Sequence, residues 1–228
     1  PDRDGWQGAV GVQVLRRDFE AIGGEAFVPP TVTKESGVFT LQRLDRDSWG
    51  IEGGVRVDTR SVRNVRADRD FTNLSASVGV FVRPFEGWFF GASASRTSRG
   101  LTEEELSSFG AHPATGAFEV GDPTLDKEVS YSLDTTAHYS DETWTLDLHG
   151  FYADYDNFID LVPTGAVDAD SGFPVFNFVQ GGAEFYGAEA EIGYTAWRSG
   201  ERSFRLEASG DYVHGTTDAG PAVRIPPW

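Results

Sequence analysis

The sequence predicts an all-β protein: part of an antiparallel, up-and-down transmembrane β-barrel of which about nine strands are present. Three observations support this prediction. Apolar and polar residues alternate along segments of roughly ten residues, the connections between segments are alternately short and long, and Trp residues recur beside the short connections. Residues 1–228 are expected to form a single barrel segment.

The hairpin of residues 128–156 shows the alternation most clearly. In its first arm Tyr131 and Leu133 share one face, and in its second arm Leu148 and His149 point to opposite faces, as neighbouring side chains of a strand do. Each arm is about a dozen residues long, against roughly five or six for most soluble strands and about 9–11 for a tilted strand that crosses a bilayer. The hairpin therefore favours a barrel wall.

Five strands are expected before this hairpin, at residues 6–16, 37–44, 49–58, 71–82 and 88–96. The first, WQGAVGVQVLR, puts Trp and Val on one face, and the third, WGIEGGVRVD, sets Trp, Ile and Val against Glu, Arg and Asp. The fourth, FTNLSASVGVFV, sets Leu and Val against Asn and Ser. The second and fifth, GVFTLQRL and WFFGASASR, each border a short turn of charged, Pro or Gly residues.

Two strands are expected after the hairpin, at residues 183–197 and 203–214. The first sets Tyr and Ile against Glu, and the second sets Phe and Leu against Arg and Glu. Short connections are expected near 45–48, 84–87, 140–143 and 198–202, and long ones near 18–36, 59–70, 97–127 and 156–183. Bacterial barrels place short turns at the periplasmic rim and longer loops outside the cell, which explains this alternation.

Two local features are expected inside the long connections. TEEEL is predicted to form one helical turn with Thr102 as its N-cap. Residues Phe173 to Val179 are expected to extend a strand beyond the membrane.

Five Trp residues lie next to the chain start or a short connection. Trp6, Trp49, Trp88 and Trp144 open strands, and Trp197 closes one. An amphipathic indole is favoured at a membrane interface, so these residues are expected to form one ring at one rim. The alternative is that Trp simply favours strand ends. Trp228 lies outside the pattern.

Composition excludes several classes of protein. The formal net charge of −17 makes nucleic acid a poor partner. The chain contains no Cys and no apolar run of about 18 residues, so neither a disulfide framework nor a transmembrane helix is expected. No nucleophile motif such as GxSxG occurs, so we expect neither an enzyme nor a cofactor.

Two other architectures or functions remain possible at this stage. A soluble all-β sandwich that acts as a binding domain would bury Leu146, Leu148, Ile192 and Leu206 in a core, whereas a barrel would expose them to lipid. A passive outer-membrane diffusion barrel would have the same wall, but its complete gene would encode no plug domain.

Two groups of polar residues are candidates for a site. Asp147, His149, Glu189 and Glu191 are expected to face the lumen along the path of a cationic or chelated metal substrate. The alternative is ordinary lumen solvation and cross-strand pairing.

The second group is a candidate metal site. His112 lies in the same long connection as Glu103 and Glu104, and imidazole with carboxylates is a common ligand set for divalent metals. Folding of the connection would have to bring the three side chains together.

Residues 88–194 resemble the later half of the barrel of TonB-dependent outer-membrane receptors. The resemblance rests on ASASRTSRGLTEEEL, GAHPATGAFEVGDPTLDKEVSYSLD, GFYADYDNFI and AEFYGAEAEIGY, and the terminal RIPPW resembles a segment that precedes the last strands of such barrels. Family members commonly carry an Asn/Asp-Pro-x-Leu-x-x-Glu stretch at the entry to a strand. Within the family, the segment HPATGAFEVGDP is most similar to a subgroup linked to metal uptake, notably of zinc.

The resemblance implies a location and a function. It implies a bacterial outer-membrane protein in contact with lipid, whose long extracellular loops capture a metal chelate such as a siderophore, zinc or a similar scarce nutrient. The plug domain, the TonB-contacting box and the final strands of the family are expected to be missing from residues 1–228, so contact with TonB would need the missing plug region. An odd number of strands with two unpaired edges also fits part of a larger barrel.

Overall fold

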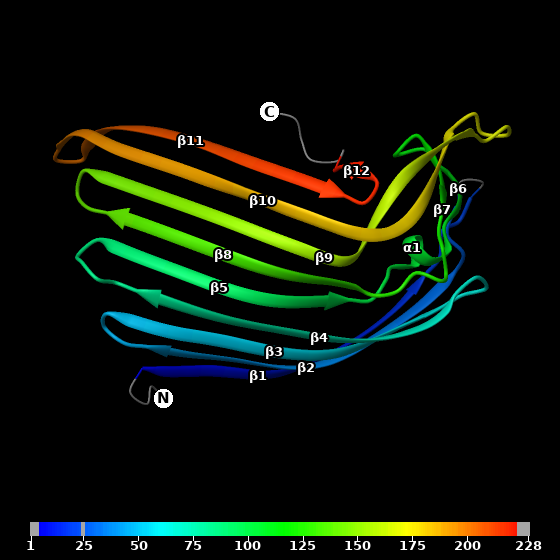
Figure 1. The fold of residues 1–228 in the computed structure, drawn as a ribbon, viewed down its shortest axis with the longest axis horizontal. Coiled ribbons are helices and arrows are strands. Elements are labelled where there is room, and N and C mark those ends of the chain that lie inside the picture. The colour runs from blue at the N-terminus through cyan, green and yellow to red at the C-terminus, as the bar shows by residue number, and fades with distance from the viewer. Residues whose placement is uncertain (1–4, 24–25, 223–228) are drawn as a thin grey trace.

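A computed structural model describes residues 5–23 and 26–222. These residues form one 12-stranded sheet in which all strand pairs are antiparallel except that of β7 with β10, which is parallel (Figure 1). The sheet order is β1-β2-β3-β4-β5-β8-β9-β10-β11-β12, and β6 and β7 branch from it through β10. The strands are β1 (Trp6–Phe19), β2 (Thr31–Asp45), β3 (Trp49–Arg63), β4 (Asp68–Val82), β5 (Trp88–Arg99), β6 (Phe109–His112), β7 (Ala117–Val120), β8 (Glu128–Ser140), β9 (Trp144–Val167), β10 (Pro174–Ser199), β11 (Arg202–Thr217) and β12 (Gly220–Pro221).

The nine expected strands are all present in the described ranges, as the nine long strands of the sheet. The additional strands β6, β7 and β12 are short. Alternation predicted the long strands because each has one apolar and one polar face through most of its length.

The expected loops near 59–70 and 156–183 are wrong in extent. Strand β3 continues to Arg63 and leaves only residues 64–67 as a turn, and β9 and β10 leave only residues 168–173 between them. Strand β2 likewise begins at Thr31, earlier than expected. Beyond the lipid-facing zone backbone pairing continues, but no lipid imposes the alternation there, and Val62 and Ile159 pack instead in an apolar core. The expected extension over Phe173 to Val179 is confirmed from Pro174 onward.

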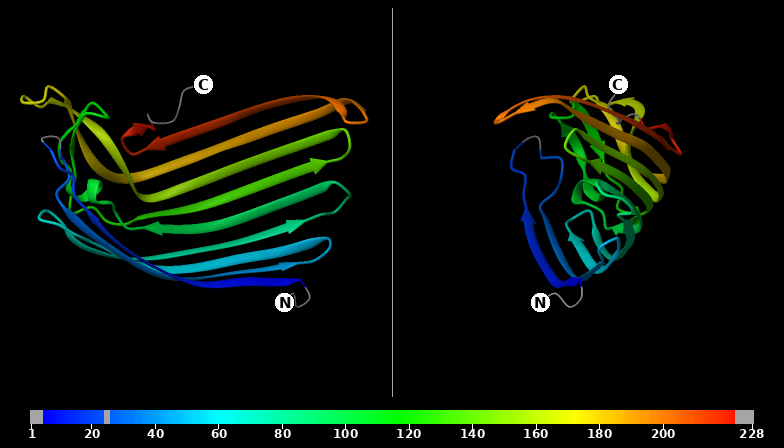
Figure 2. Two further views of the ribbon diagram at one scale, coloured as in Figure 1. Left: turned by 180° about the vertical axis from the view of Figure 1, so that it is seen from behind. Right: turned by 90° about the vertical axis from the view of Figure 1, so that its left-hand side faces the viewer.

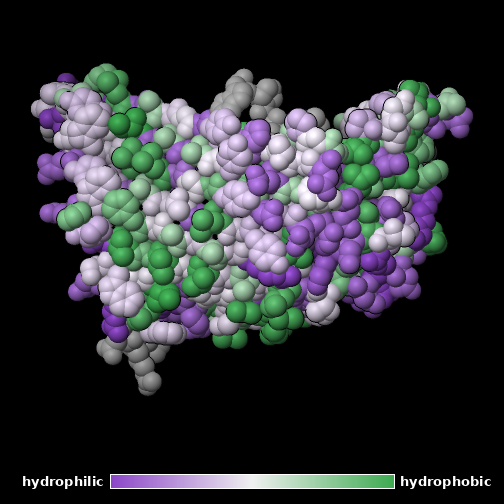
Figure 3. Space-filling model, in the orientation of Figure 1, coloured by the Kyte–Doolittle hydropathy of each residue, from purple (hydrophilic) through white to green (hydrophobic). Residues whose placement is uncertain are grey.

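The sheet curves into an open trough rather than stacking on a second sheet (Figure 2). Leu148, Ile192 and Leu206 are 40%, 44% and 53% exposed, and Leu146 is half-buried. The sandwich alternative is therefore wrong, because a sandwich would seal these side chains in a core. Figure 3 shows apolar and pale residues over the barrel wall at the left and centre, and hydrophilic residues gathered at the opposite end.

The Trp residues of the described chain lie at the rim of short turns, at the left of Figure 1. Trp144 packs against Tyr194 in a tilted arrangement with ring centroids 4.4 Å apart, and Trp88 packs likewise against Tyr139 at 4.8 Å. Trp6 Nε1 donates to Gln42 Oε1 at 2.9 Å. The expected ring at one rim is confirmed for these residues. Trp228, together with the RIPPW segment, lies outside the described residues.

The height of the apolar zone agrees with a bilayer. On the outward face of β1, the zone runs from Trp6 to Arg16 through Val10, Val12 and Val14, which are 72–80% exposed. At about 3.3 Å per residue and a strand tilt near 40°, this distance corresponds to roughly 25 Å, the height of the lipid-facing band of outer-membrane barrels.

The short turn between β8 and β9 is fixed by one carboxylate. Asp141 accepts hydrogen bonds from the Tyr139 hydroxyl at 2.6 Å and from the backbone N–H groups of Thr143 at 2.7 Å and Trp144 at 2.6 Å. The Tyr139 hydrogen bond, followed by the backbone donors, lowers the pKa of Asp141 below its usual value.

The connection between β5 and β8 is folded at the opposite rim. It contains α1 (Glu103–Ser107), and Thr102 and Glu105 form a capping box at its start, which confirms the expected N-cap. Leu101, Leu106 and Leu125 of this connection pack with Phe71 and Ile159 of the wall in the apolar core. No helix of the described residues is long and apolar enough to span a membrane.

Candidate functional site

The inner face of the trough brings the four expected lumen residues into one patch. Glu189 of β10 is directly opposite His149 of β9, and Glu191 is directly opposite Asp147. Directly opposed side chains have Cβ atoms about 4.5–5.5 Å apart, so the four groups are close neighbours. Strict alternation along β9 and β10 places them all on the face away from Leu148 and Ile192.

Strand β11 adds a carboxylate to this patch. Asp211 is directly opposite Glu189, and Ser209 is opposite Glu191. A hollow of about 430 Å³ lies over the patch and is lined by Asp147, His149, Glu189, Ala190, Glu191, Ser209, Gly210 and Asp211. We call this set the acidic patch. Asp211 is not among the lumen residues expected from the sequence, although its alternation with Leu206 and Tyr212 along β11 places it on the face away from them.

The negative charge of the acidic patch is largely uncompensated. His138 Nδ1 lies 2.6 Å from Asp147 Oδ1. Among the described residues, no Lys or Arg forms an ion pair with Glu189, Glu191 or Asp211. Like charges that face one another across strands repel, so the patch attracts cations.

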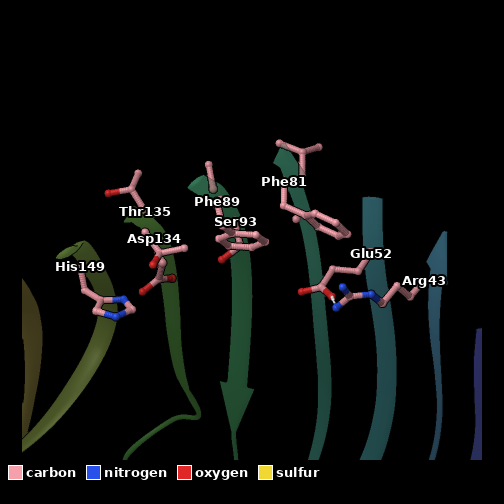
Figure 4. Close-up of a pocket in the computed structure, with 13 residues that line it drawn as sticks. Arg43, Glu52, Phe81, Phe89, Ser93, Asp134, Thr135 and His149 are labelled. Atoms are coloured by element: carbon pink, nitrogen blue, oxygen red, sulfur yellow. Dashed lines mark hydrogen bonds and ion pairs between the residues drawn. The ribbon is translucent and has the colours of Figure 1, made fainter. Parts of the chain in front are cut away.

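A second hollow of about 280 Å³ adjoins the patch on the same face (Figure 4). Arg43 and Glu52 line one end and form an ion pair at 3.2 Å, and Asp134 and His149 line the other end. His149 therefore belongs to both hollows. Between its polar ends the second hollow is lined by apolar residues that include Phe81, Phe89 and Ala92.

Phe81 gives this second hollow a rigid aromatic wall. Its ring lies 4.5 Å from the Arg43 guanidinium and 4.8 Å from that of Arg83, and it covers Gly50, where a Cβ atom would lie 2.1 Å from Phe81 Cζ. These contacts join residues of three different strands. They could not be predicted from the sequence, because alternation along one strand does not show which residues of separate strands lie opposite one another.

The structure does not bring the three expected metal ligands together. Glu103 is fully buried and its carboxylate faces arginines: Arg17 donates to it, and Arg60 Nη2 lies 3.6 Å away. His112 instead places Nδ1 3.0 Å from Glu119 Oε1. Within the described ranges, no group of three or more His, Asp or Glu residues could hold a metal ion. Metal binding by His112, Glu103 and Glu104 therefore gains no support from the geometry and stays a prediction.

A family model described as TonB dependent receptor-like, beta-barrel, matches residues 3–228. Among solved structures, the copper transporter OprC is similar with a TM-score of 0.77 and 17% identity, over 96% of this chain and 36% of that chain. The FpvAI–pyocin S2 complex gives a TM-score of 0.64 and 13% identity over 96% and 32% of the two chains. The FrpB iron transporter from Neisseria meningitidis (F5-1 variant) gives 0.59 and 17% over 84% and 28%.

At these identities the likeness concerns the fold. The present chain spans about a third of the length of these solved structures.

Proposed function

Because the chain belongs to the TonB-dependent receptor-like β-barrel family, we propose that it forms part of the wall of an outer-membrane transporter that imports a metal or metal chelate. Siderophore complexes, zinc and similar scarce nutrients are the substrate class. Copper and iron transporters among proteins of the same fold support this class.

The observation that carries the proposal is the acidic patch. Four carboxylates and one imidazole line an open hollow on the inner face, and three of those carboxylates have no cationic partner in the described part of the chain. Charges of one sign on a low-dielectric wall concentrate counter-ions, and carboxylate and imidazole groups suit divalent metals. A metal ion, or a chelate that exposes the positive charge of its metal, is therefore attracted to this face and guided along β8 to β11.

The outward face supports a location in the bacterial outer membrane. Exposed Val, Leu and Ile side chains form a zone about as high as a bilayer core, with Trp residues at one end. Lipid is the partner of this face. We propose that coupling to TonB goes through the plug region of the family.

Uptake by the complete receptor tests the proposal. Cells that produce the receptor are given radioactive zinc, copper or a ferric siderophore, and the double variant Glu189→Gln/Glu191→Gln is compared with the parent. Loss of two charges from the patch is expected to lower the initial rate of uptake about tenfold, at the lower end of electrostatic steering effects. The matched control is Asp154→Asn/Glu184→Gln, which removes two carboxylates from the outward face of the same strands.

Two outcomes would contradict the proposal. Equal uptake by the parent and the Glu189→Gln/Glu191→Gln variant would show that the acidic patch does not guide the substrate. Undiminished uptake in cells lacking TonB would instead indicate a passive diffusion barrel.

A further inference from the structure

The outward face of β1 to β4 changes its chemistry in three successive cross-strand rows. The first row is apolar and consists of Val12, Val38, Val57 and Leu74, all exposed. The next row toward the rim of α1 consists of Val14, Ser36, Thr59 and Thr72, and the row beyond it of Arg16, Lys34, Ser61 and Asp70. This order of apolar, hydroxyl and charged groups matches the order of acyl chain, polar linker and headgroup in a lipid.

Two cations are directly opposite each other in the last row. Arg16 of β1 pairs in register with Lys34 of β2, and both side chains are exposed. Like charges in directly opposed positions destabilise a sheet. This arrangement is unfavourable for the chain alone and becomes favourable if an anion lies between the two groups.

The acids nearby offset this repulsion only in part, since Asp18 is paired with Arg16 and also attracts Lys34. Asp18 accepts from Arg16 Nε and Nη2 at 3.0 Å, but both side chains are at least 60% exposed, so the ion pair is weak. Asp70 accepts from Arg63 at 2.5 Å. Lys34 forms no ion pair with any described residue.

A hollow of about 440 Å³ lies between these rows. Its outward-pointing side chains are those of Val14, Arg16, Lys34, Ser36, Thr59, Ser61, Asp70 and Thr72. The short Ser and Thr side chains leave the space open, and the two cations border it. We call it the rim hollow.

We infer that the rim hollow binds the phosphate headgroup of an anionic lipid of the outer leaflet. Lys34 and Arg16 contact the phosphate, the hydroxyl row contacts the linker, and the exposed Val row contacts the acyl chains. The outward side of β8 to β10 toward the same rim carries Tyr131, Asp154 and Glu184 instead, so the basic pair is a local feature. The inference rests on the proposed membrane location and is independent of the imported substrate.

Lipid binding to the complete receptor, purified and delipidated in dodecyl maltoside, tests the inference. Native mass spectrometry counts molecules of dioleoylphosphatidic acid that bind as the lipid is titrated. Near a membrane surface each basic residue strengthens binding to anionic lipid roughly fivefold, so Arg16→Gln/Lys34→Gln is expected to weaken the tightest binding event about thirtyfold. The charge-retaining exchange Arg16→Lys/Lys34→Arg is expected to bind like the parent.

The matched control is Arg198→Gln/Arg202→Gln, which removes two exposed cations at the opposite rim and is expected to leave the tightest event unchanged. Dioleoylphosphatidylcholine is expected to bind weakly to the parent and equally to all variants. Heat-modified mobility on gels confirms that each variant is folded, and Lys34→Gln alone replaces the double variant if that variant fails to fold.

Three results would overturn the inference. They are an unchanged affinity of Arg16→Gln/Lys34→Gln for phosphatidic acid, equal binding of phosphatidylcholine, and displacement of phosphatidic acid by millimolar inorganic phosphate. The last result would identify a site for small anions rather than a lipid site. Because no readout involves uptake, failure here is distinguishable from failure of the transport proposal.

Discussion

Replacing Leu148 with Arg places a charge at the centre of the lipid-facing zone. Leu148 is 40% exposed on the outward face of β9, four residues from Trp144 at the short-turn rim and four from Tyr152 toward the other rim. It therefore lies near the midplane of the zone. An Arg at the midplane of a barrel costs about 2–4 kcal/mol, and at the lower limit the ratio of folded to unfolded protein falls about thirtyfold.

The adjacent residue supplies the control. His149→Arg introduces the same side chain one position further along β9, where it faces the acidic patch and water. We expect reversible urea unfolding of the complete receptor in lipid vesicles to show the loss for Leu148→Arg and little or no loss for His149→Arg. Equal free energies of unfolding for the two variants would refute the assignment of faces on β9.

Three further perturbations test local packing and charge. Leu106→Ala removes a fully buried side chain and should destabilise the connection between β5 and β8 by about 2–5 kcal/mol. The loss should appear as faster hydrogen exchange over residues 100–127. Unchanged exchange would mean that this core does not hold the connection in place. Gly50→Val puts a Cβ atom 2.1 Å from Phe81 Cζ and 2.7 Å from the Leu44 carbonyl oxygen, so urea unfolding should show a loss of about 1–3 kcal/mol, of which Phe81→Ala in the same chain relieves only part. The folded pKa of Asp141 lies below its unfolded value near 3.9, so its stabilisation of the turn is fully present above that pH and is lost as the pH falls through the lower folded pKa. Over that range, hydrogen exchange at residues 141–144 should accelerate more in the parent than in Asp141→Asn. Parallel pH profiles for the two proteins would count against the contact.

Alternation predicted the parts of the fold that lie within the apolar zone. Leu148 and His149, or Ile192 and Glu191, differ so strongly in polarity that their faces follow from the sequence alone. Residues 59–63 and 158–167 lie outside this zone, where no lipid requires one apolar outer face and where Val62, Ile159 and Leu161 are buried instead, so their strand structure was missed. Thr102 was predicted as a cap because a capping box is defined by neighbours in sequence.

The patch of Asp147, His149, Glu189 and Glu191 was assembled from the sequence for the same reason: period-two spacing puts all four on one face. Spacing along one strand does not predict contacts between residues of separate segments, because these depend on how the segments are aligned. The stack of Phe81 on Gly50 and the burial of Glu103 against Arg17 each join residues more than 30 positions apart in the chain. From the sequence alone, the acidic run around Glu103 is expected to be solvated or to bind metal. The sequence does not show that Arg17 and Arg60 lie beside Glu103.

Collision accessibility of spin labels along β9 tests most directly whether this wall has an outer face toward lipid and an inner face toward water. Single Cys variants at each position from 144 to 152 of the complete receptor in vesicles are labelled and exposed to oxygen, which partitions into lipid, and to a water-soluble nickel chelate. The account predicts that even-numbered positions collide more with oxygen and odd-numbered positions more with the chelate. Accessibility without a two-residue period, or with the two sets exchanged, would contradict it.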